Sequence, residues 1–457
     1  MASAMNGNRR WERYPAYKDS GVEWLGEIPT WWDVVPLKSI APVVTRGNGP
    51  EYVEGGGIPV VNQACIYWDG LHAENVRYHK LTDVSGYKGL LRPWDLLVNS
   101  TGTGTLGRAV VFNEDGVYIA DSHVTIVRLN LSEIDARYVL YLVSTGLYQG
   151  FVYAALVSGS TNQIELSREG LRATPVVVPP LSEQQAITAF LDRETARIDV
   201  LVAKQRRLVE LLQEKRTALI QRAVTKGLDP SVPMKDSGVE WLGEIPTGWK
   251  AVKLRWLSEK ISSGKTPLGG SEVYSEEGVI FIRSQNVYDN GLRLDDVVHI
   301  SDAIDEDMRA TRVRAGDVLL NITGASIGRS CLVPHGFPRA NVNQHVCIVR
   351  AKTQVTPDFL AYCLKAAMAK DQIQVAQVGS SREGLSYSDA GDLIVVLPFG
   401  NLSMQHAIVS FLDRETAKID TLVVKVAEAI ERLREYRSAL ISAAVTGKID
   451  VREPSAG

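Results

Sequence analysis

The sequence predicts an α+β protein in which two mixed α/β domains, related by a pseudo-two-fold axis, are joined by two long helices that form an antiparallel coiled coil. Three observations lead to this fold class. The 457-residue chain repeats long strings of its own sequence, two of its stretches lack glycine and proline, and short β-like runs fill the segments between them.

Internal repetition is the first of these observations. The string KDSGVEWLGEIPT (Lys18–Thr30) returns unchanged at Lys235–Thr247, and FLDRETA (Phe190–Ala196) returns at Phe411–Ala417. Between these strings the two copies diverge but stay in register, so that LLVNSTG aligns with LLNITG and SHVTIVR with QHVCIVR. A duplicated frame with different filling predicts one scaffold that presents two different surfaces.

The segments 31–180 and 248–398 are expected to form the two mixed domains. Both contain short runs of β-branched and aromatic residues, such as IPVV and VIFI, which are typical of strands. Helices are expected near 136–155 and 357–377. The other predicted divisions are an N-terminal segment at 1–30, a helical spacer that carries the second copy of that segment at 181–247, and a C-terminal helical region at 399–457.

The stretches 182–224 and 403–445 contain no glycine or proline and predict long helices that stop at Gly227 and Gly447. Ser182 and Gln185 predict a capping box at the start of the first helix. In the second helix His406 replaces the glutamine, so Ser403 alone is expected to cap it.

Apolar residues spaced alternately by three and four positions predict a coiled-coil seam between these helices. The alternative is that each helix is amphipathic and lies on its own domain. Antiparallel pairing follows if the duplicated halves are related by a two-fold axis. The predicted seam comprises Ile198, Leu201, Leu208, Leu212 and Leu219, with Gln205 and Lys215 fixing the register, and Ile419, Leu422, Val426, Ala429, Leu433, Tyr436 and Leu440 in the second helix.

The composition constrains the function classes. Four scattered cysteines favour a reducing, cytoplasmic setting, and no apolar run is long enough to suggest a membrane segment or a secretory signal. The net charge of −3 and the pI of about 6.2 differ from those of an isolated, basic DNA-binding domain. If this chain binds DNA, partner subunits are expected to supply much of the attraction to phosphate.

Four strings carry a resemblance to a known family: KDSGVEWLGEIPTGW, SGKTP (Ser263–Pro267), GDVLLNITGASIGR (Gly316–Arg329) and LSEQQAITAFLDRETARID (Leu181–Asp199). In this order they resemble the specificity subunits of type I restriction–modification systems, over nearly the whole chain. The first copy departs from the pattern, because RGNGP replaces SGKTP and WDLLVNSTGTGTLGR carries one extra residue.

The resemblance implies that this chain recognises DNA and that its partner subunits carry out the reactions. Each mixed domain would be a target-recognition domain that reads one half of a split double-stranded DNA site. The helices would dock two modification subunits, which methylate adenine with S-adenosylmethionine, and two ATP- and Mg-dependent restriction subunits could join them. This chain would hold no catalytic centre, cofactor or metal.

Motifs that suggest a nucleotide site, a serine nucleophile or a zinc site are not repeated in both copies of the frame. Gly102–Gly107 fits GxGxxG and Gly324–Gly328 fits GxSxG, but each pattern occurs in only one copy of the same loop. Of the zinc-like set Cys331, His335, His345 and Cys347, only the histidine at 345 is repeated, as His123, and both histidines are expected to be buried and hydrogen-bonded. No adenine-methyltransferase motif or Walker A loop is found.

Base reading needs polar side chains on loops, and paired loops supply them in both copies. Arg283 and Arg382 are the preferred candidates for guanine contacts, and Arg108 and Arg329 are expected near phosphates. For any single residue the alternative is a solvated loop. The full candidate set is Asn62, Gln63, Arg108, Ser160, Thr161, Asn162, Lys265, Thr266, Arg283, Gln285, Asn286, Arg329, Ser380, Ser381 and Arg382.

Trp24, Leu25, Trp241 and Leu242 lie in the identical strings, which cannot distinguish unlike half-sites, so they are expected to pack against the ends of the coiled coil. Two rival functions remain. One is a pseudo-dimeric scaffold that joins two ligands other than DNA. The other is a solitary DNA methyltransferase component, which would bind S-adenosylmethionine by itself.

Overall fold

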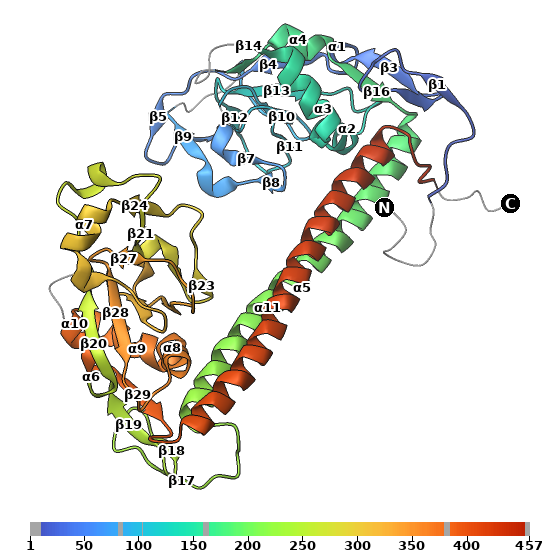
Figure 1. The fold of residues 1–457 in the computed structure, drawn as a ribbon. Helices are drawn as coiled ribbons and strands as arrows, with labels where there is room; N and C mark the ends of the chain where they lie inside the picture. Colours follow the sequence, from blue (N-terminus) through green and yellow to red (C-terminus); the bar gives the residue numbers. More distant parts are fainter. Residues whose placement is uncertain (1–10, 81–85, 103, 159–163, 379–383, 453–457) are drawn as a thin grey trace. The chain divides into compact units, whose positions relative to one another are not determined.

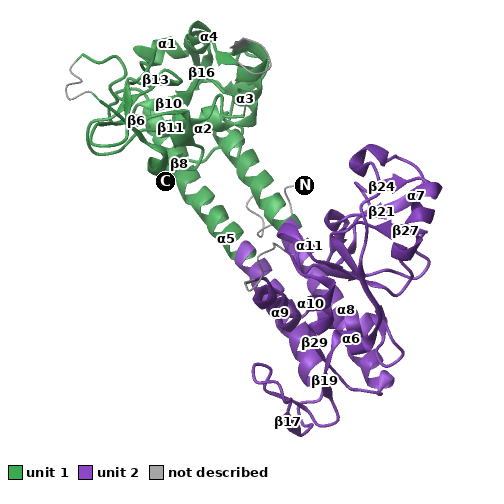
Figure 2. Ribbon diagram, turned by 90° about the vertical axis from the view of Figure 1, so that its left-hand side faces the viewer, with its two compact units in different colours: residues 1–205, 428–457 green, residues 206–427 purple. Residues whose placement is uncertain are grey.

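The computed structural model describes residues 11–80, 86–102, 104–158, 164–378 and 384–452. It divides into two compact units, which Figure 2 shows in different colours: unit 1 is Met1–Gln205 with Glu428–Gly457, and unit 2 is Arg206–Ala427. The boundary crosses both long helices, so each unit holds one mixed α/β domain and one end of each helix.

The main sheet of unit 1 is antiparallel and has the strand order β11-β10-β13-β4 (Figure 1). A smaller sheet has the order β12-β6-β9-β5, in which β12 and β6 are parallel. A third pair joins β3 to β16 at the two ends of the domain sequence. The strands are β3 (Asp33–Pro36), β4 (Val43–Arg46), β5 (Tyr52–Val53), β6 (Ile58–Val61), β9 (Arg77–His79), β10 (Leu96–Asn99), β11 (Ala109–Val111), β12 (Ile119–Ala120), β13 (Val124–Arg128) and β16 (Pro175–Val178).

Unit 2 repeats this topology. Its main sheet has the order β20-β28-β25-β26, its smaller sheet the order β24-β21-β27 with β21 and β27 parallel, and β19 pairs with β29. In place of β5, Ser275 forms an isolated antiparallel bridge to His299 of β24. The strands are β19 (Lys250–Lys253), β20 (Ser258–Ser263), β21 (Val279–Ile282), β24 (Val298–Ile300), β25 (Val318–Asn321), β26 (Ser330–Leu332), β27 (Ala340–Val342), β28 (Val346–Ala351) and β29 (Ile394–Leu397).

The single helix expected in the second half of each domain is two helices. In unit 1, α2 (Ala136–Ser144) and α3 (Gly146–Phe151) are separated by Thr145, whose backbone is extended. The Thr145 hydroxyl accepts a hydrogen bond from the amide of Tyr148 and so caps α3, which explains the break. In unit 2, Ala366 separates α8 (Pro357–Lys365) from α9 (Ala367–Val378). Shorter helices are α1 (Leu37–Ile40), α4 (Arg168–Ala173), α6 (Leu254–Leu257), α7 (Asp302–Asp307) and α10 (Tyr387–Asp392).

The long helices are α5 (Leu181–Lys226) and α11 (Leu402–Val445), and both begin one residue before the predicted caps. The amides of Glu183 and Gln184 donate to the carbonyl of Pro180, so Ser182 is already inside α5. The side chain of Asn401, and not Ser403, caps α11 by accepting from the amide of Met404 at 3.0 Å.

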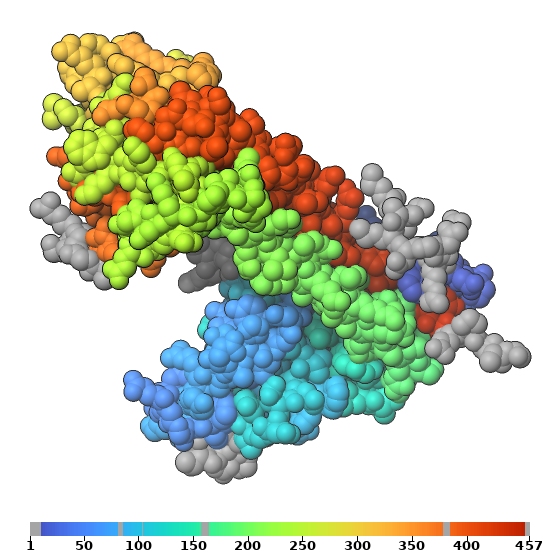
Figure 3. Space-filling model, turned by 90° about the horizontal axis from the view of Figure 1, so that it is seen from below, coloured from blue at the N-terminus to red at the C-terminus, as the bar shows by residue number. Residues whose placement is uncertain are grey.

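The two long helices pair in opposite directions within each unit, and their side chains meet in the space-filling view (Figure 3). In unit 1 the seam residues Ile198, Leu433 and Leu440 belong to one hydrophobic core together with α2 and β16. In unit 2 the end of α5, at Ile220, packs with the beginning of α11, at Ile408. These contacts bear out the antiparallel pairing expected from the duplication.

Every second residue of the predicted seam is exposed or less buried, and the residue that follows it in the sequence takes its place in the seam. Ile198, Gln205, Leu212 and Leu219 face the partner helix, but Val202, Val209 and Arg216 lie between them instead of Leu201, Leu208 and Lys215. In α11, Val423, Ile430 and Arg437 likewise replace Leu422, Ala429 and Tyr436. The predicted Leu201, Leu208, Leu422 and Tyr436 are 46%, 41%, 48% and 44% exposed.

The repeated strings cover the C-terminal ends of the long helices. In unit 1, hairpin β1 (Tyr17–Asp19)–β2 (Glu27–Pro29) brings Leu25, Ile28 and Trp32 into one core with Ala444 and Val445. In unit 2, hairpin β17 (Met234–Asp236)–β18 (Glu244–Pro246) brings Ile245 and Trp249 against Ala223 and Val224. Trp24 packs on Tyr148 and Phe151 of α3 and not on the coiled coil as expected, and Trp241 is 54% exposed.

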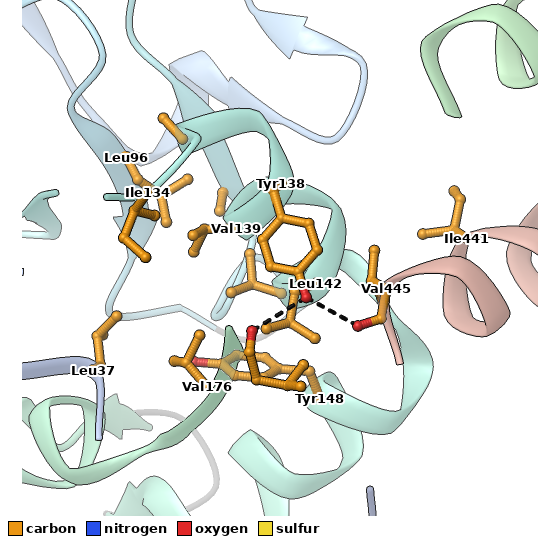
Figure 4. Packing of buried hydrophobic residues seen from close by; sticks show 14 of the residues in the cluster. Leu37, Leu96, Ile134, Tyr138, Val139, Leu142, Tyr148, Val176, Ile441 and Val445 are labelled. Carbon is orange, nitrogen blue, oxygen red and sulfur yellow. Dashed lines mark hydrogen bonds between the residues drawn. The ribbon is translucent and has the colours of Figure 1, made fainter. Parts of the chain in front are cut away.

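One buried tyrosine ties the domain of unit 1 to α11. The hydroxyl of Tyr138 lies 3.1 Å from the carbonyl oxygens of both Val177 and Val445 (Figure 4). Burial raises the pKa of Tyr138 well above its usual value, so the hydroxyl keeps its proton and acts as a donor. The contact fixes the last turn of α11 against β16.

Candidate functional site

The polar loops of each domain gather at one end of the strands of its main sheet. Because the sheet is antiparallel, the end of β10, the start of β13 and the end of β4 lie side by side at the same end of the sheet. We call these segments the loop surface of each unit. In unit 1 it comprises the described residues of 46–50, 62–65, 99–108 (without residue 103), 121–123 and 164–166, and in unit 2 it comprises residues 263–267, 283–286, 321–329, 343–345 and 384–385.

Hydrogen bonds hold the loop surface of unit 1 together. The side-chain amide of Asn99 donates to the carbonyl of Gln63 at 3.1 Å. The hydroxyl of Thr101 lies 2.9 Å from Nδ1 of His123. Arg46 pairs with Glu165 and donates to the carbonyl of Leu166 at 2.8 Å, which attaches the fifth segment. Loops that are far apart in the sequence therefore form one surface.

The loop surface of unit 2 uses the same bonds at the equivalent positions. Asn321 donates to the carbonyl of Ser284 at 2.8 Å, and the hydroxyl of Thr323 lies 2.5 Å from Nδ1 of His345. The amide of Leu385 donates to the carbonyl of Ile322 at 2.7 Å, as the amide of Leu166 does to the carbonyl of Ser100 at 2.8 Å in unit 1. The frame of the two surfaces is thus common to both units.

Two candidate base-reading residues are engaged inside the protein. Asn62 is buried, its oxygen accepts from the amide of Ala64, and its nitrogen donates to the carbonyl of Asn75. Asn286 is fully buried and bonds to Arg283, Arg293 and Asp296. Both side chains shape the short turns that follow β6 and β21. The sequence showed polar residues on a loop but not the direction in which they point.

The other candidates of this loop pair reach the surface to different degrees. Gln63 is half-buried, with its side-chain oxygen 3.4 Å from the hydroxyl of Thr101. Gln285 is exposed and pairs with Asp296. The guanidinium of Arg283 donates to the carbonyl of Asp296 at 2.9 Å and is half-buried. Lys265 and Thr266 are exposed.

Both candidate phosphate-contacting arginines stack on a tyrosine. Arg108 lies over the ring of Tyr67, 5.0 Å from its centroid, and Arg329 lies over Tyr288 at 4.9 Å. A cavity adjoins each pair, with volumes of about 490 Å³ at Arg108 and 310 Å³ at Arg329. The equivalence of the two tyrosines in the repeat was visible in the sequence, but nothing there showed that each carries an arginine.

The last pair of candidate loops cannot be assessed. Ser160, Thr161 and Asn162, and their counterparts Ser380, Ser381 and Arg382, lie outside the described residues. Described residues next to these segments belong to the loop surfaces, since Glu165 pairs with Arg46 and Leu385 with Ile322.

The motifs set aside from the sequence have structural roles. The hydroxyl of Ser326 accepts from the side chain of Asn321 at 3.0 Å inside a glycine turn. Burial raises the pKa of Cys331 and of Cys347 to about 12, which disfavours the thiolate that a metal needs. Among the described residues, no group of three or more His, Cys, Asp or Glu side chains is placed to hold a metal ion.

The two repeated histidines differ from the expectation of burial. His123 is exposed and His345 is half-buried, although each makes the expected hydrogen bond, to Thr101 and Thr323. Both lie at the centre of a loop surface, immediately before β13 and β28. They are part of the accessible frame and not of the core.

In the described part of the chain, no single helix is long and apolar enough to cross a membrane. The bent pair Ala136–Ser144 and Gly146–Leu156 passes the same criteria of length and composition when taken together.

Comparisons with known proteins agree with this duplicated architecture. The family model for the type I restriction modification DNA specificity domain matches residues 29–210 and again residues 246–432. The putative type I restriction enzyme MjaX specificity subunit of Methanocaldococcus jannaschii is 24% identical over 441 residues, which cover 94% of this chain and 96% of the relative. The type I restriction enzyme EcoBI specificity subunit of Escherichia coli is 25% identical over 317 residues, which cover 65% of this chain and 64% of the relative.

Solved structures share the fold. A chain from a study of complex assembly and conformational transition in the type I R-M system superposes with a TM-score of 0.69 at 17% identity. The HsdS subunit from Thermoanaerobacter tengcongensis superposes with a TM-score of 0.51 at 16% identity. Each likeness covers 92% of this chain and 98% of the solved chain.

Proposed function

Because this chain belongs to the type I restriction modification DNA specificity family, we propose that each loop surface reads one half of a bipartite site in double-stranded DNA. The chain is the sequence-specificity subunit of such a system and not its catalytic component. One observation carries the proposal: the two loop surfaces share a frame of hydrogen bonds but differ in the side chains that they expose.

The shared and the variable parts suit different tasks. The Thr–His and Arg–Tyr pairs occur in both units, so they suit features common to any duplex, such as phosphates. At other, exposed positions the copies differ: Asn48 corresponds to Lys265, and Gly49 to Thr266. Unlike side chains on like frames would give unlike half-sites. Arg283 and Arg382 remain the proposed guanine contacts.

The exposed apolar residues of the long helices support docking of two modification subunits. Leu201 of α5 and Leu422 of α11 occupy equivalent positions and are both close to half exposed, and Leu208 continues the row one heptad later. Large exposed apolar residues in rows are typical of protein interfaces. Since Leu201 and Leu422 occupy equivalent positions on the two helices, the same kind of partner would bind twice.

The partners would supply the catalytic activities and much of the positive charge that attracts DNA. S-adenosylmethionine would bind to the modification subunits, and ATP and Mg to two restriction subunits where these are present. The net charge of −3 fits a chain that relies on its partners for attraction to phosphate. The four cysteines are free and buried, in keeping with the reducing cytoplasm where such partners would meet DNA.

The test is modified-base sequencing of DNA from cells that express this chain with its modification subunit, compared with cells that lack this chain. The expected result is N6-methyladenine at one split motif, present only with this chain. If both proteins are expressed and associated but no methylated motif depends on this chain, the proposal is wrong and a scaffold for other ligands takes its place.

A further inference from the structure

We propose that Gln344, on the loop surface of unit 2, reads an adenine in the half-site bound by that unit. The inference rests on the proposed DNA-reading function and names one of its contacts. Gln344 is exposed and lies two residues before the start of β28, between the loops of Thr266 and Thr323. The sequence did not single out Gln344, because its neighbour His345 is repeated in the other copy and Gln344 is not.

The side chain of Gln344 is held at both ends. The hydroxyl of Thr266 donates to its oxygen, and its nitrogen lies 3.0 Å from Nε2 of His345. The other ring nitrogen of His345 lies 2.5 Å from the hydroxyl of Thr323. A chain of hydrogen bonds thus crosses the loop surface from Thr266 through Gln344 and His345 to Thr323.

The direction of these bonds follows from the chemistry of the groups. The amide nitrogen of Gln344 can only donate, so Nε2 of His345 must accept. The ring proton then lies on Nδ1 and points to the hydroxyl oxygen of Thr323. Each amide atom of Gln344 therefore has one defined internal partner, which fixes the orientation of the amide plane.

The remaining capacity of the amide matches adenine. The oxygen keeps one free lone pair and the nitrogen keeps one free N–H on the exposed amide. In the major groove adenine offers an N6 donor next to an N7 acceptor, which is the complementary pattern. Guanine offers two acceptors, O6 and N7, so its O6 would face the amide oxygen of Gln344 without a hydrogen between them.

Unit 1 cannot make this contact. The positions of Thr266 and Gln344 are taken there by Gly49 and Ser122, whose side chains are absent or too short to bridge to His123. His123 is accordingly exposed, whereas His345 is half-buried. The adenine contact thus belongs to one half-site, as two unlike half-sites require.

The experiment uses the complex of this chain with its modification subunit. Methylated motifs are sequenced, and affinities are measured for duplexes that differ at single base pairs of the site. Gln344→Ala is expected to relax one A·T position in one half-site by about 10- to 100-fold, with the other half-site unchanged. Gln344→Glu, which lacks the N–H, is expected to lose the same adenine preference. Thr266→Val should relax the same base pair more weakly, because it only releases the amide oxygen.

Gln374→Ala is the matched control, since Gln374 is an exposed glutamine of the same unit on α9. It is expected to leave the motif and all affinities unchanged. The inference is overturned if Gln344→Ala keeps the wild-type motif and affinities, or if affinity falls equally for all sequences, which would indicate a phosphate contact. Failure of the proposed function would look different, because then even the wild-type complex would methylate no motif.

Discussion

Arg437 of α11 faces Asp199 of α5, with its guanidinium Nε 3.1 Å from the carboxylate Oδ1. The repeat places the same pair in unit 2, where Nε of Arg216 lies 3.5 Å from Oδ1 of Asp420. Both arginines lie on the seam, and both aspartates are more than half exposed at its edge. Such reciprocal contacts arise when two copies of one helix pair by a two-fold operation, because residue i then meets j and j meets i.

The first prediction concerns the energy of this pair. A double-mutant cycle with Asp199→Ala and Arg437→Ala should give a coupling of about 0.3–1 kcal/mol in the free energy of unfolding, since the pair is partly exposed. Denaturant unfolding of the full chain measures it. The control cycle pairs Asp199 with Arg216, which lie roughly 25 Å apart along one helix and should show no coupling. Equal coupling in both cycles would contradict the pairing.

The second prediction separates the seam from the exposed row. Leu433 is 9% exposed and Leu422 is 48% exposed, although both were predicted to be seam residues. Leu433→Ala should destabilise the chain by about 2–3 kcal/mol through lost packing. Leu422→Ala should cost less than about 1 kcal/mol but weaken binding of the modification subunit. Denaturant unfolding and titration with that subunit give the two values, and a reversal of the order would restore the predicted seam.

For the coiled coil, the antiparallel pairing of the helices could be predicted from the sequence, but the exact seam residues could not. Duplication predicted two like domains and two antiparallel helices, because repeated strings fix correspondences without any knowledge of packing. The heptad positions were misplaced since Leu201 and Val202 are both apolar, as are Leu208 and Val209, and spacing alone cannot choose between adjacent apolar residues. The choice is made by tertiary contacts of neighbouring residues, such as Leu191 with the core of unit 1.

The loop surfaces show a similar limit. The positions of the loops were predictable from the repeat, but the role of each side chain depended on its direction. Asn62 and Asn286 point inward and hold turns, whereas Gln344 points outward and is positioned by Thr266, a residue far away in the sequence. Hydrogen bonds between distant loops leave no pattern in a single sequence.

The third prediction concerns pH and the buried carboxylate of Asp305. Burial would raise the pKa of Asp305, but hydrogen bonds from Arg312, Asn341 and Arg339 outweigh this effect and hold the pKa below its usual value. A depressed folded-state pKa stabilises the protein above the unfolded-state pKa of about 4, and this contribution is lost as the pH falls through the folded value.

Asp305→Asn should therefore destabilise the chain by about 3 kcal/mol at pH 7, because two arginines lose their buried partner. The difference from wild type should shrink as the pH falls from about 4, where the unfolded chain takes up a proton, through the lower folded-state pKa of Asp305. Unfolding free energies at pH 7 and pH 3 measure both values. A difference that stays constant with pH would mean that Asp305 is not ionised in the folded chain.

The fourth prediction distinguishes the shared frame from the variable side chains. Arg329 lies over Tyr288 as Arg108 does over Tyr67, so each arginine occupies the same place on its loop surface. Arg329→Ala and Arg108→Ala should each weaken DNA binding by the complex to a similar extent for specific and altered sequences. Each should also lower the slope of log affinity against log salt by about one, as expected for the loss of one phosphate contact. The methylated motif should stay the same. Binding measured over a salt series with duplexes of different sequence tests this, and a change of motif in either variant would make that arginine a base-reading residue instead.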